Sequence, residues 1–395
     1  MAVNNSSNSE RNAADRPIAI AAAIAIGSVA VAVFNLQPMY LGALADHLGF
    51  SAGQLGLIAG VEVAGSAIAG VAAIFWVRLW NWRRVALIAL LTMVIGNIAS
   101  AFVTDFVTLA TIRFCTGLIG AGTAYALSVA ALSDTRDVDK NFSITIVAMV
   151  SVAIVGFLVL PPYIAELGPQ AVFWSLAFIA TITLPMIRSL PTKSHKSLAD
   201  ETNHSKSGST LVWLAVACQC VWYMGLGGVW AFVERLATDA NIAAEGIGQA
   251  LAIGLAVGLI GAFAAALLAD RFGRIIPFTI AMLGQVAAVV LLVDLESIST
   301  LIIAICVYNT TWNFALPYLF SVAAVADTGG RLVALMTTAQ TLGLTIGAMI
   351  AGTIVGRYGL EAILYQGGIL AIAALAIYIG LALRLPLKSA AAMPD

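Results

Sequence analysis

Two ionisable side chains lie deep inside long apolar stretches of the chain. Glu62 lies about nine residues into the stretch 53–77, and Arg113 about six residues into the stretch 107–133. At a helical rise of ~1.5 Å per residue, they would lie ~14 Å and ~9 Å from the helix ends. A carboxylate in a medium of low dielectric constant can exchange protons near neutral pH. We predict proton coupling at Glu62, with Arg113 as its partner or as an anion-binding group. A static ion pair, or an Arg113 that caps backbone carbonyls, is the alternative.

Polar and aromatic side chains also recur on single faces of other apolar stretches. In the stretch 211–236 such residues follow one another at steps of three and four, and the stretch 298–326 is unusually polar at its centre. We predict that these faces line a substrate cavity, together with two isolated glutamines: Gln37, Gln219, Trp222, Tyr223, Trp230, Asn309, Trp312, Asn313 and Gln340. Hydrogen bonds between helices and aromatic belts at the membrane surface are the alternative.

Composition identifies the elements that must position these residues. Of the 395 residues, 61% are hydrophobic and only 10% are charged, whereas soluble domains carry roughly 25% charged residues. A helix needs about 20 apolar residues to cross a bilayer. The sequence therefore predicts an all-α integral membrane protein with twelve transmembrane helices, near 18–45, 53–77, 84–103, 107–133, 142–165, 170–190, 211–236, 247–269, 275–293, 298–326, 332–356 and 360–384.

The positions of the charges predict the orientation of these helices. With the amino terminus in the cytoplasm, 16 of the 19 basic residues fall in cytoplasmic segments, and the outer connectors carry mainly acids. We predict a cytoplasmic tail at 1–16, a six-helix bundle at 17–190, a linker at 191–210, a second bundle at 211–385 and a cytoplasmic tail at 386–395. Both termini would then be cytoplasmic in a multi-pass protein of the inner (plasma) membrane. Glu234, near the outer end of the seventh helix, is predicted to be a gating residue.

The two halves of the chain resemble each other. The segment from Ser128 to Asp134 (SVAALSD) ends the fourth predicted helix, and the segment from Ser321 to Asp327 (SVAAVAD) ends the tenth, 193 residues later. Tyr125 and Tyr318 match at the same offset. The sequence therefore predicts two pseudo-symmetric bundles of six helices. Parallel six-helix repeats are typical of transporters, which bind their solute between the halves.

Two short sequence motifs indicate which family of transporters the chain resembles. The segment from Leu267 to Arg274 (LLADRFGR) resembles the cytoplasmic loop signature of the major facilitator superfamily, and Arg113 with Gly117 resembles the fourth-helix motif of that family. The resemblance implies a central cavity lined by helices one, four, seven and ten, and a coupling role for Arg113. It also implies an inner gating latch at Asp270, Arg271 and Arg274. The loop from Trp76 to Arg84 (WVRLWNWRR) lacks the Asp and Gly that the family carries there.

These observations favour a secondary active transporter that moves a small organic solute, a carboxylate or an aromatic compound, by proton-coupled alternating access. Proton-driven efflux of drugs or metabolites, or an uncoupled facilitator, is the alternative. A nucleotide-binding G-x-x-x-x-G-K-[ST] loop does not occur in the sequence, and no histidine lies in any predicted helix, which argues against a membrane enzyme. We expect no cofactor, no metal, no disulfide and no nucleic-acid partner, and a monomer in the lipid bilayer whose partners are the solute and protons.

Overall fold

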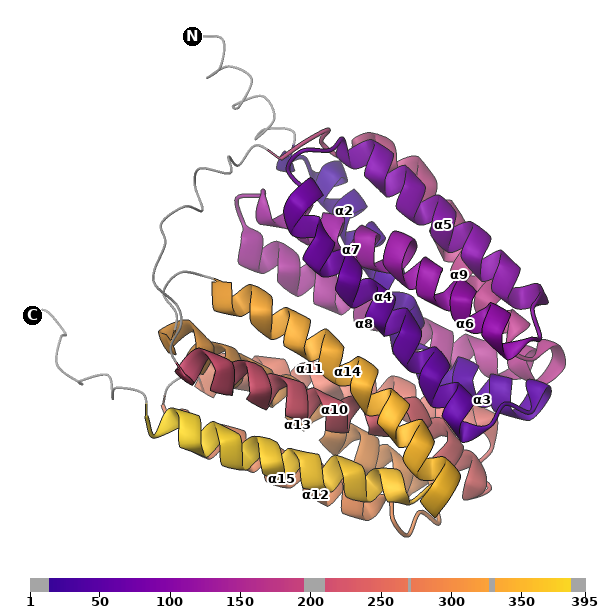
Figure 1. The fold of residues 1–395 in the computed structure, drawn as a ribbon, viewed down its shortest axis with the longest axis vertical. Coiled ribbons are helices and arrows are strands. Elements are labelled where there is room, and N and C mark those ends of the chain that lie inside the picture. Colours follow the sequence, from indigo (N-terminus) through magenta and orange to yellow (C-terminus); the bar gives the residue numbers. More distant parts are fainter. Residues whose placement is uncertain (1–13, 195–209, 269–270, 327–330, 385–395) are drawn as a thin grey trace, which may run out of the picture.

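The chain folds into helices that follow the predicted spans one by one (Figure 1). The computed structural model describes residues 14–194, 210–268, 271–326 and 331–384, and these contain no strand. The amino-terminal half contains α2 (Pro17–Asn35), α3 (Gln37–Leu48), α4 (Ala52–Trp76), α5 (Trp82–Phe102), α6 (Phe106–Cys115), η1 (Thr116–Ala121), α7 (Gly122–Ser133), α8 (Val138–Leu167), α9 (Gln170–Thr183) and η2 (Leu184–Ser189). The carboxy-terminal half contains α10 (Thr210–Asp239), α11 (Ala244–Leu268), α12 (Ile275–Leu291), α13 (Ile298–Ala326), α14 (Arg331–Tyr358) and α15 (Ala362–Ala382).

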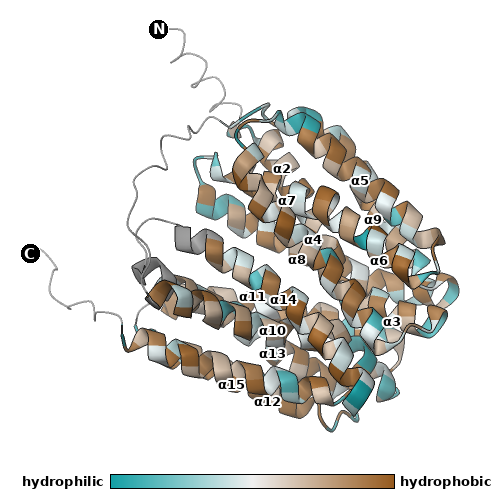
Figure 2. Ribbon diagram, viewed as in Figure 1, coloured by the Kyte–Doolittle hydropathy of each residue, from teal (hydrophilic) through white to brown (hydrophobic). Residues whose placement is uncertain are grey.

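The predicted number of spans agrees with these helices. In the described part of the chain, eleven helices are long and apolar enough to cross a membrane, when α6, η1 and α7 are taken as one and α9 is joined with η2. The remaining span is α12, an apolar helix of 17 residues. Hydrophobic residues extend along the helices, and hydrophilic residues gather near their ends (Figure 2). Large apolar side chains such as Ile74 and Phe75 are 65% and 75% exposed, as expected for a surface that faces lipid.

Two of the spans are interrupted, and local chemistry explains the first interruption. Pro38 has no N–H to donate to the Phe34 carbonyl four residues earlier, so the first span breaks into α2 and α3 at Leu36. The fourth span passes through η1, a π-helical segment, and such segments are often found at functional sites. Asp105 begins this span as the N-cap of α6. Hydrogen bonds from Thr108 hold the pKa of the Asp105 carboxyl below its usual value.

The two bundles contact each other through the outer parts of three pairs of helices. We use "inner" for the side on which α2 begins, which the charge pattern predicts to be cytoplasmic, and "outer" for the opposite side. The bundles meet where α4 packs on α14, α8 on α11, and α3 on α10. Glycines mark the contact: a Cβ at Gly56 would lie 2.5 Å from the Ala348 carbonyl oxygen, and one at Gly248 would lie 2.2 Å from the Phe157 carbonyl oxygen. These positions all belong to the outer parts of their helices.

The inner parts of the bundles pack within their own halves. Here α2 packs on α7, α8 and α9, whereas α13 packs mainly on α11 and α12. In Figure 1 the helices of the two halves form two groups, which lie closest at the end where α3 meets the carboxy-terminal half. The structure therefore shows a conformation that is closed on the outer side.

Candidate functional site

Glu62 and Arg113 form an ion pair inside the amino-terminal bundle. Arg113 Nη2 lies 3.5 Å from Glu62 Oε1, and the two side chains are 0% and 4% exposed. Two glycines allow α4 to approach the fourth span closely enough for this pairing. A Cβ at Gly117 would lie 2.2 Å from the Glu62 carbonyl oxygen, and one at Gly65 would lie 2.5 Å from the Phe114 carbonyl oxygen. The Arg113-xxx-Gly117 spacing thus places a cation and its helix contact one turn apart.

The neighbouring residues supply only some of the hydrogen bonds that Glu62 and Arg113 could form. Arg113 Nη1 donates to Asn97 Oδ1 at 2.9 Å, and the guanidinium lies 5.2 Å from the centre of the Phe173 ring. The Tyr40 hydroxyl donates to Glu62 Oε2 at 3.5 Å. Arg113 Nε has no hydrogen-bond partner among the described residues, and the 3.5 Å contact between Nη2 and Oε1 is too long for a good hydrogen bond. Buried charges that are poorly hydrogen-bonded are costly, which makes this pair a candidate functional site.

A second cluster lies in the carboxy-terminal bundle and joins three spans. The Trp312 indole donates to the Tyr223 hydroxyl at 3.0 Å, and the two rings meet edge to face at 5.9 Å. Gln340 of α14 interacts with the same hydroxyl. Trp312, Asn313 and Gln340 are partly exposed. Tyr125 of α7, in the other bundle, is 44% exposed and lies close enough to Tyr223 to interact electrostatically. This cluster therefore keeps part of its surface accessible and lies near Tyr125 of the other bundle.

Residues of α10 close the outer side. The Trp230 indole donates to the Phe34 carbonyl at 3.2 Å, and its ring packs edge to face on Phe157 at 6.3 Å. Pro38 cannot donate to this carbonyl, which also accepts a backbone hydrogen bond at the end of α2. The carboxy-terminal bundle therefore adds a hydrogen bond at the break in the first span. Trp230, predicted to line the cavity, instead lies in the seal between the bundles.

Charged residues of the same helix support this seal. Arg235 pairs with Asp46 across the interface. The Glu234 carboxylate packs against Gly42 of α3 and accepts a hydrogen bond from the Thr238 hydroxyl at 2.8 Å. Its Oε2 has no partner among the described residues. The structure thus places Glu234 at the outer contact between the halves, where a gating residue would act.

Six of the nine residues predicted to line a cavity have almost no accessible surface, so they line no open cavity in this conformation. They are Gln37, Gln219, Trp222, Tyr223, Trp230 and Asn309. Trp222 donates to Gln285 Oε1 at 2.9 Å and packs on Phe278, inside its own bundle. Asn309 bonds to the Ile305 carbonyl of its own helix and packs on Gly258. Helical spacing assigned these residues to faces, but it could not tell that neighbouring helices cover those faces.

Two of the six are buried glutamines that differ in whether their amides are hydrogen-bonded. Gln37 donates to the Ala59 carbonyl at 3.3 Å, which ties α3 to α4 beside Glu62. Neither amide atom of Gln219 has a hydrogen-bond partner among the described residues, although the side chain is fully buried. A buried amide without partners costs free energy, so Gln219 remains a candidate for contact with a solute or an ordered water molecule.

The predicted inner latch is only partly described. Asp270 lies outside the described residues, Arg271 is exposed, and the Arg274 carbonyl accepts a hydrogen bond from Tyr378 at 3.1 Å. Sequence reasoning missed Tyr40, Asn97 and Phe173, which complete the surroundings of the ion pair. Asn97 could have been found as an isolated amide in an apolar span. The two aromatic residues carry no such signal, because they look like ordinary core.

Comparisons with known proteins agree with this architecture. The family model described as Major Facilitator Superfamily matches residues 19–328, so the chain belongs to this superfamily of transporters and is not an enzyme. A structure of the nucleoside transporter NupG (D323A mutant) is similar with a TM-score of 0.78 and 11% identity, over 92% of this chain and 99% of that chain.

Two further structures share the fold. A D-xylose-proton symporter is similar with a TM-score of 0.72 and 15% identity, over 91% of this chain and 96% of that chain. A bacterial homologue of the human lysosomal transporter Spinster, described as inward-facing and unoccupied, gives a TM-score of 0.71 and 13% identity over 93% and 97%. No curated protein sequence matches this chain.

Proposed function

We propose that the protein is a secondary active transporter that moves a small organic solute across the inner membrane by alternating access, with Glu62 as the proton carrier. The observation that carries the proposal is the buried and incompletely hydrogen-bonded pair of Glu62 and Arg113. In such a pair, protonation of Glu62 removes one charge and leaves Arg113 unpaired. A proton can therefore change the electrostatics of the bundle.

The burial of Arg113 supports coupling rather than direct binding of an anionic solute. Its guanidinium has no accessible surface and is held by Asn97, Phe173 and Glu62. An anion could reach it only after these contacts rearranged. Ion pairs inside a membrane domain commonly mark proton relays.

The contacts between the bundles support alternating access. The outer seal consists of a few separable interactions: Trp230 with Phe34, Arg235 with Asp46, and the close approach of Gly56 to α14. Rocking of one six-helix bundle against the other would break these contacts and open the outer side. The outer-closed arrangement then corresponds to one of the two end states of the cycle, with both termini in the cytoplasm.

The partly exposed side chains between the bundles favour a solute with an apolar ring and polar edges. Trp312 and Tyr125 offer aromatic surface, and Asn313 and Gln340 offer amide donors and acceptors. Solved structures of similar fold include one described as a nucleoside transporter and one described as a D-xylose-proton symporter. A first solute panel would therefore contain nucleosides, pentoses, and small aromatic and carboxylic acids.

The test is transport in proteoliposomes with Glu62→Gln beside the wild type. We expect a pH gradient to drive accumulation of a panel solute by the wild type, whereas Glu62→Gln retains counterflow exchange but loses accumulation. Glu245→Gln, at an exposed position of α11, is the matched control and should accumulate solute normally. Equal accumulation by Glu62→Gln and wild type would show that Glu62 is structural. Exchange without gradient-driven accumulation in the wild type would identify an uncoupled facilitator.

A further inference from the structure

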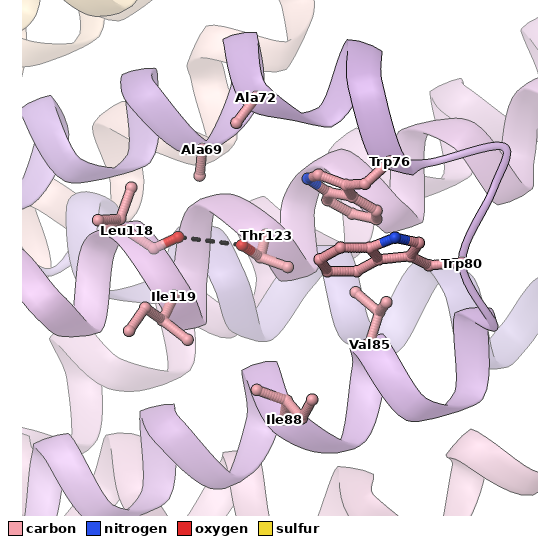
Figure 3. Close-up of a pocket in the computed structure, with 9 residues that line it drawn as sticks. All are labelled: Ala69, Ala72, Trp76, Trp80, Val85, Ile88, Leu118, Ile119 and Thr123. Carbon is pink, nitrogen blue, oxygen red and sulfur yellow. Dashed lines mark hydrogen bonds between the residues drawn. The ribbon is translucent and has the colours of Figure 1, made fainter.

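A groove on the inner part of the amino-terminal bundle is not used by the proposed transport mechanism. It has a volume of about 250 Å³ and lies between α4, α5 and η1. We call it the inner groove, and Figure 3 shows its lining, with the Trp76 and Trp80 indoles at the end next to the loop that joins α4 to α5. The two rings lie 6.1 Å apart.

The lining of the inner groove is apolar. Ala72, Val85, Ile88 and Ile119 contribute hydrocarbon, and the hydroxyl of Thr123 is already bonded to the Leu118 carbonyl at 3.0 Å. Water molecules in such a groove would find few hydrogen-bond partners. The groove opens on the surface that faces lipid, because Ile88 is 57% exposed and Ile119 is 45% exposed. The medium that fills it is therefore hydrocarbon.

The inner end of the groove is strongly basic. The loop and the first turn of α5 contain Arg78, Arg83 and Arg84, and no acidic residue occurs between Glu62 and Asp105. Arg84 lies one turn before Ile88 on the same helix face, and helical side chains lean toward the amino-terminal end of the helix. The Arg84 side chain is therefore directed toward the inner membrane surface, just beyond the groove, and it forms no ion pair among the described residues.

Arg83, the residue before Arg84, points to another face of α5 and is held in place there. Its Nε donates to the Leu190 carbonyl at 2.7 Å, and the neighbouring Trp82 backbone N–H donates to the Thr192 carbonyl at 2.8 Å. These contacts fix the first turn of α5 against the end of the amino-terminal bundle. Tryptophan rings beneath arginine side chains are typical of the level of lipid headgroups, and basic pockets at the cytoplasmic side bind anionic lipids.

We propose that the inner groove binds one acyl chain of an anionic phospholipid, whose phosphate is held by Arg84. The bound chain contacts Leu118 and Ile119 of η1. The preceding residue, Gly117, packs on the Glu62 carbonyl, so the lipid lies against the helix that supports the ion pair. The site requires only the membrane location of the protein and is independent of the solute and of the proton coupling.

The test measures lipid retention by native mass spectrometry of the full-length protein, in detergent supplemented with phosphatidylglycerol or phosphatidylcholine. We expect the wild type to retain one phosphatidylglycerol in preference to phosphatidylcholine. Arg84→Gln should weaken this retention about fivefold, the effect of one basic residue near an anionic surface. Ala72→Phe fills the groove and should abolish retention. Arg384→Gln, which removes an exposed arginine at the end of the other bundle, should change nothing.

A second readout uses the tryptophans of the groove. Phosphatidylglycerol brominated in its acyl chains should quench the fluorescence of Trp76 and Trp80, and Ala72→Phe should reduce this quenching while the protein stays monodisperse. The proposal is wrong if the wild type retains no lipid, if phosphatidylcholine is retained equally well, or if Ala72→Phe retains the lipid and is quenched like the wild type. Binding of inorganic phosphate by wild type and Ala72→Phe alike, without lipid retention, would identify a simple phosphate site instead.

Discussion

Removal of Arg113 is the sharpest test of the buried ion pair. In Arg113→Met, Glu62 would keep only the weak Tyr40 hydrogen bond at 3.5 Å, and Asn97 would lose the donor that now lies 2.9 Å from its Oδ1. Breaking a buried pair by removing one partner costs about 3–5 kcal/mol, because the remaining charge is uncompensated. We expect a loss of this size in the free energy of unfolding at neutral pH.

The loss should have a characteristic response to pH and to a second substitution. Protonation of Glu62 removes the uncompensated charge, so the stability difference between Arg113→Met and the wild type should shrink as the pH falls. Arg113→Met combined with Glu62→Gln removes both charges and should recover most of the loss. Paired apolar or neutral replacements of buried ions are often close to neutral in stability.

The assay is thermal or denaturant unfolding of the purified protein in detergent, followed at several pH values for the two single variants, the double variant and a control. Arg235→Met is the control, since its ion pair with Asp46 is partly exposed, at 26% and 47%, and such pairs contribute only about 0–1 kcal/mol. The reasoning fails if Arg113→Met is as stable as the wild type throughout, or if the double variant is no more stable than Arg113→Met. Either result would mean that the two charges are not energetically coupled.

Three further outcomes follow from the contacts of the site. Gly117→Ala places a Cβ 2.2 Å from the Glu62 carbonyl oxygen. It should lower the free energy of unfolding by about 1–3 kcal/mol through overpacking and impair uptake. Gly70→Ala, on the open face of α4, is the control, and equal behaviour of the two variants would contradict the close helix contact. Trp230→Phe keeps the packing on Phe157 but removes the hydrogen bond to Phe34, which is worth about 0.5–1.5 kcal/mol. Spin-label distances between the outer ends of α3 and α10 should show the ratio of outer-open to outer-closed molecules rise roughly 2- to 10-fold. An unchanged distance distribution would mean that Trp230 does not stabilise the outer seal. Tyr223→Phe removes the acceptor of the Trp312 indole hydrogen bond. The KM of a transported solute should rise, while proton coupling is retained. An altered proton-to-solute ratio with unchanged KM would assign this cluster to coupling rather than to solute binding.

Much of the architecture could be predicted because the bilayer imposes a simple physical rule on the sequence. Every backbone polar group in hydrocarbon must be satisfied internally, so each apolar stretch of about 20 residues has to be a helix. The rule located all twelve spans, and the motif around Arg113 together with the loop from Leu267 to Arg274 indicated the superfamily. The first span was predicted as one helix near 18–45, and its break at Leu36 was not predicted, although proline cannot donate the helical hydrogen bond. Counting residues along a helix of known rise predicts the depth of Glu62 and Arg113, and the structure buries both side chains inside the bundle.

Only the tertiary structure decided which side chains meet across helices and which faces are covered. The pairing of Glu62 with Arg113 depends on the glycines that bring α4 and η1 into contact, and the burial of Trp222 and Asn309 depends on α12 and α11. Helical periodicity assigns a residue to a face, but every apolar helix in a bundle offers several similar faces. The same limit explains why Trp230 was expected in a cavity and lies in the outer seal. The rotation of each helix about its axis is set by packing against its neighbours, and a single sequence does not encode that rotation locally.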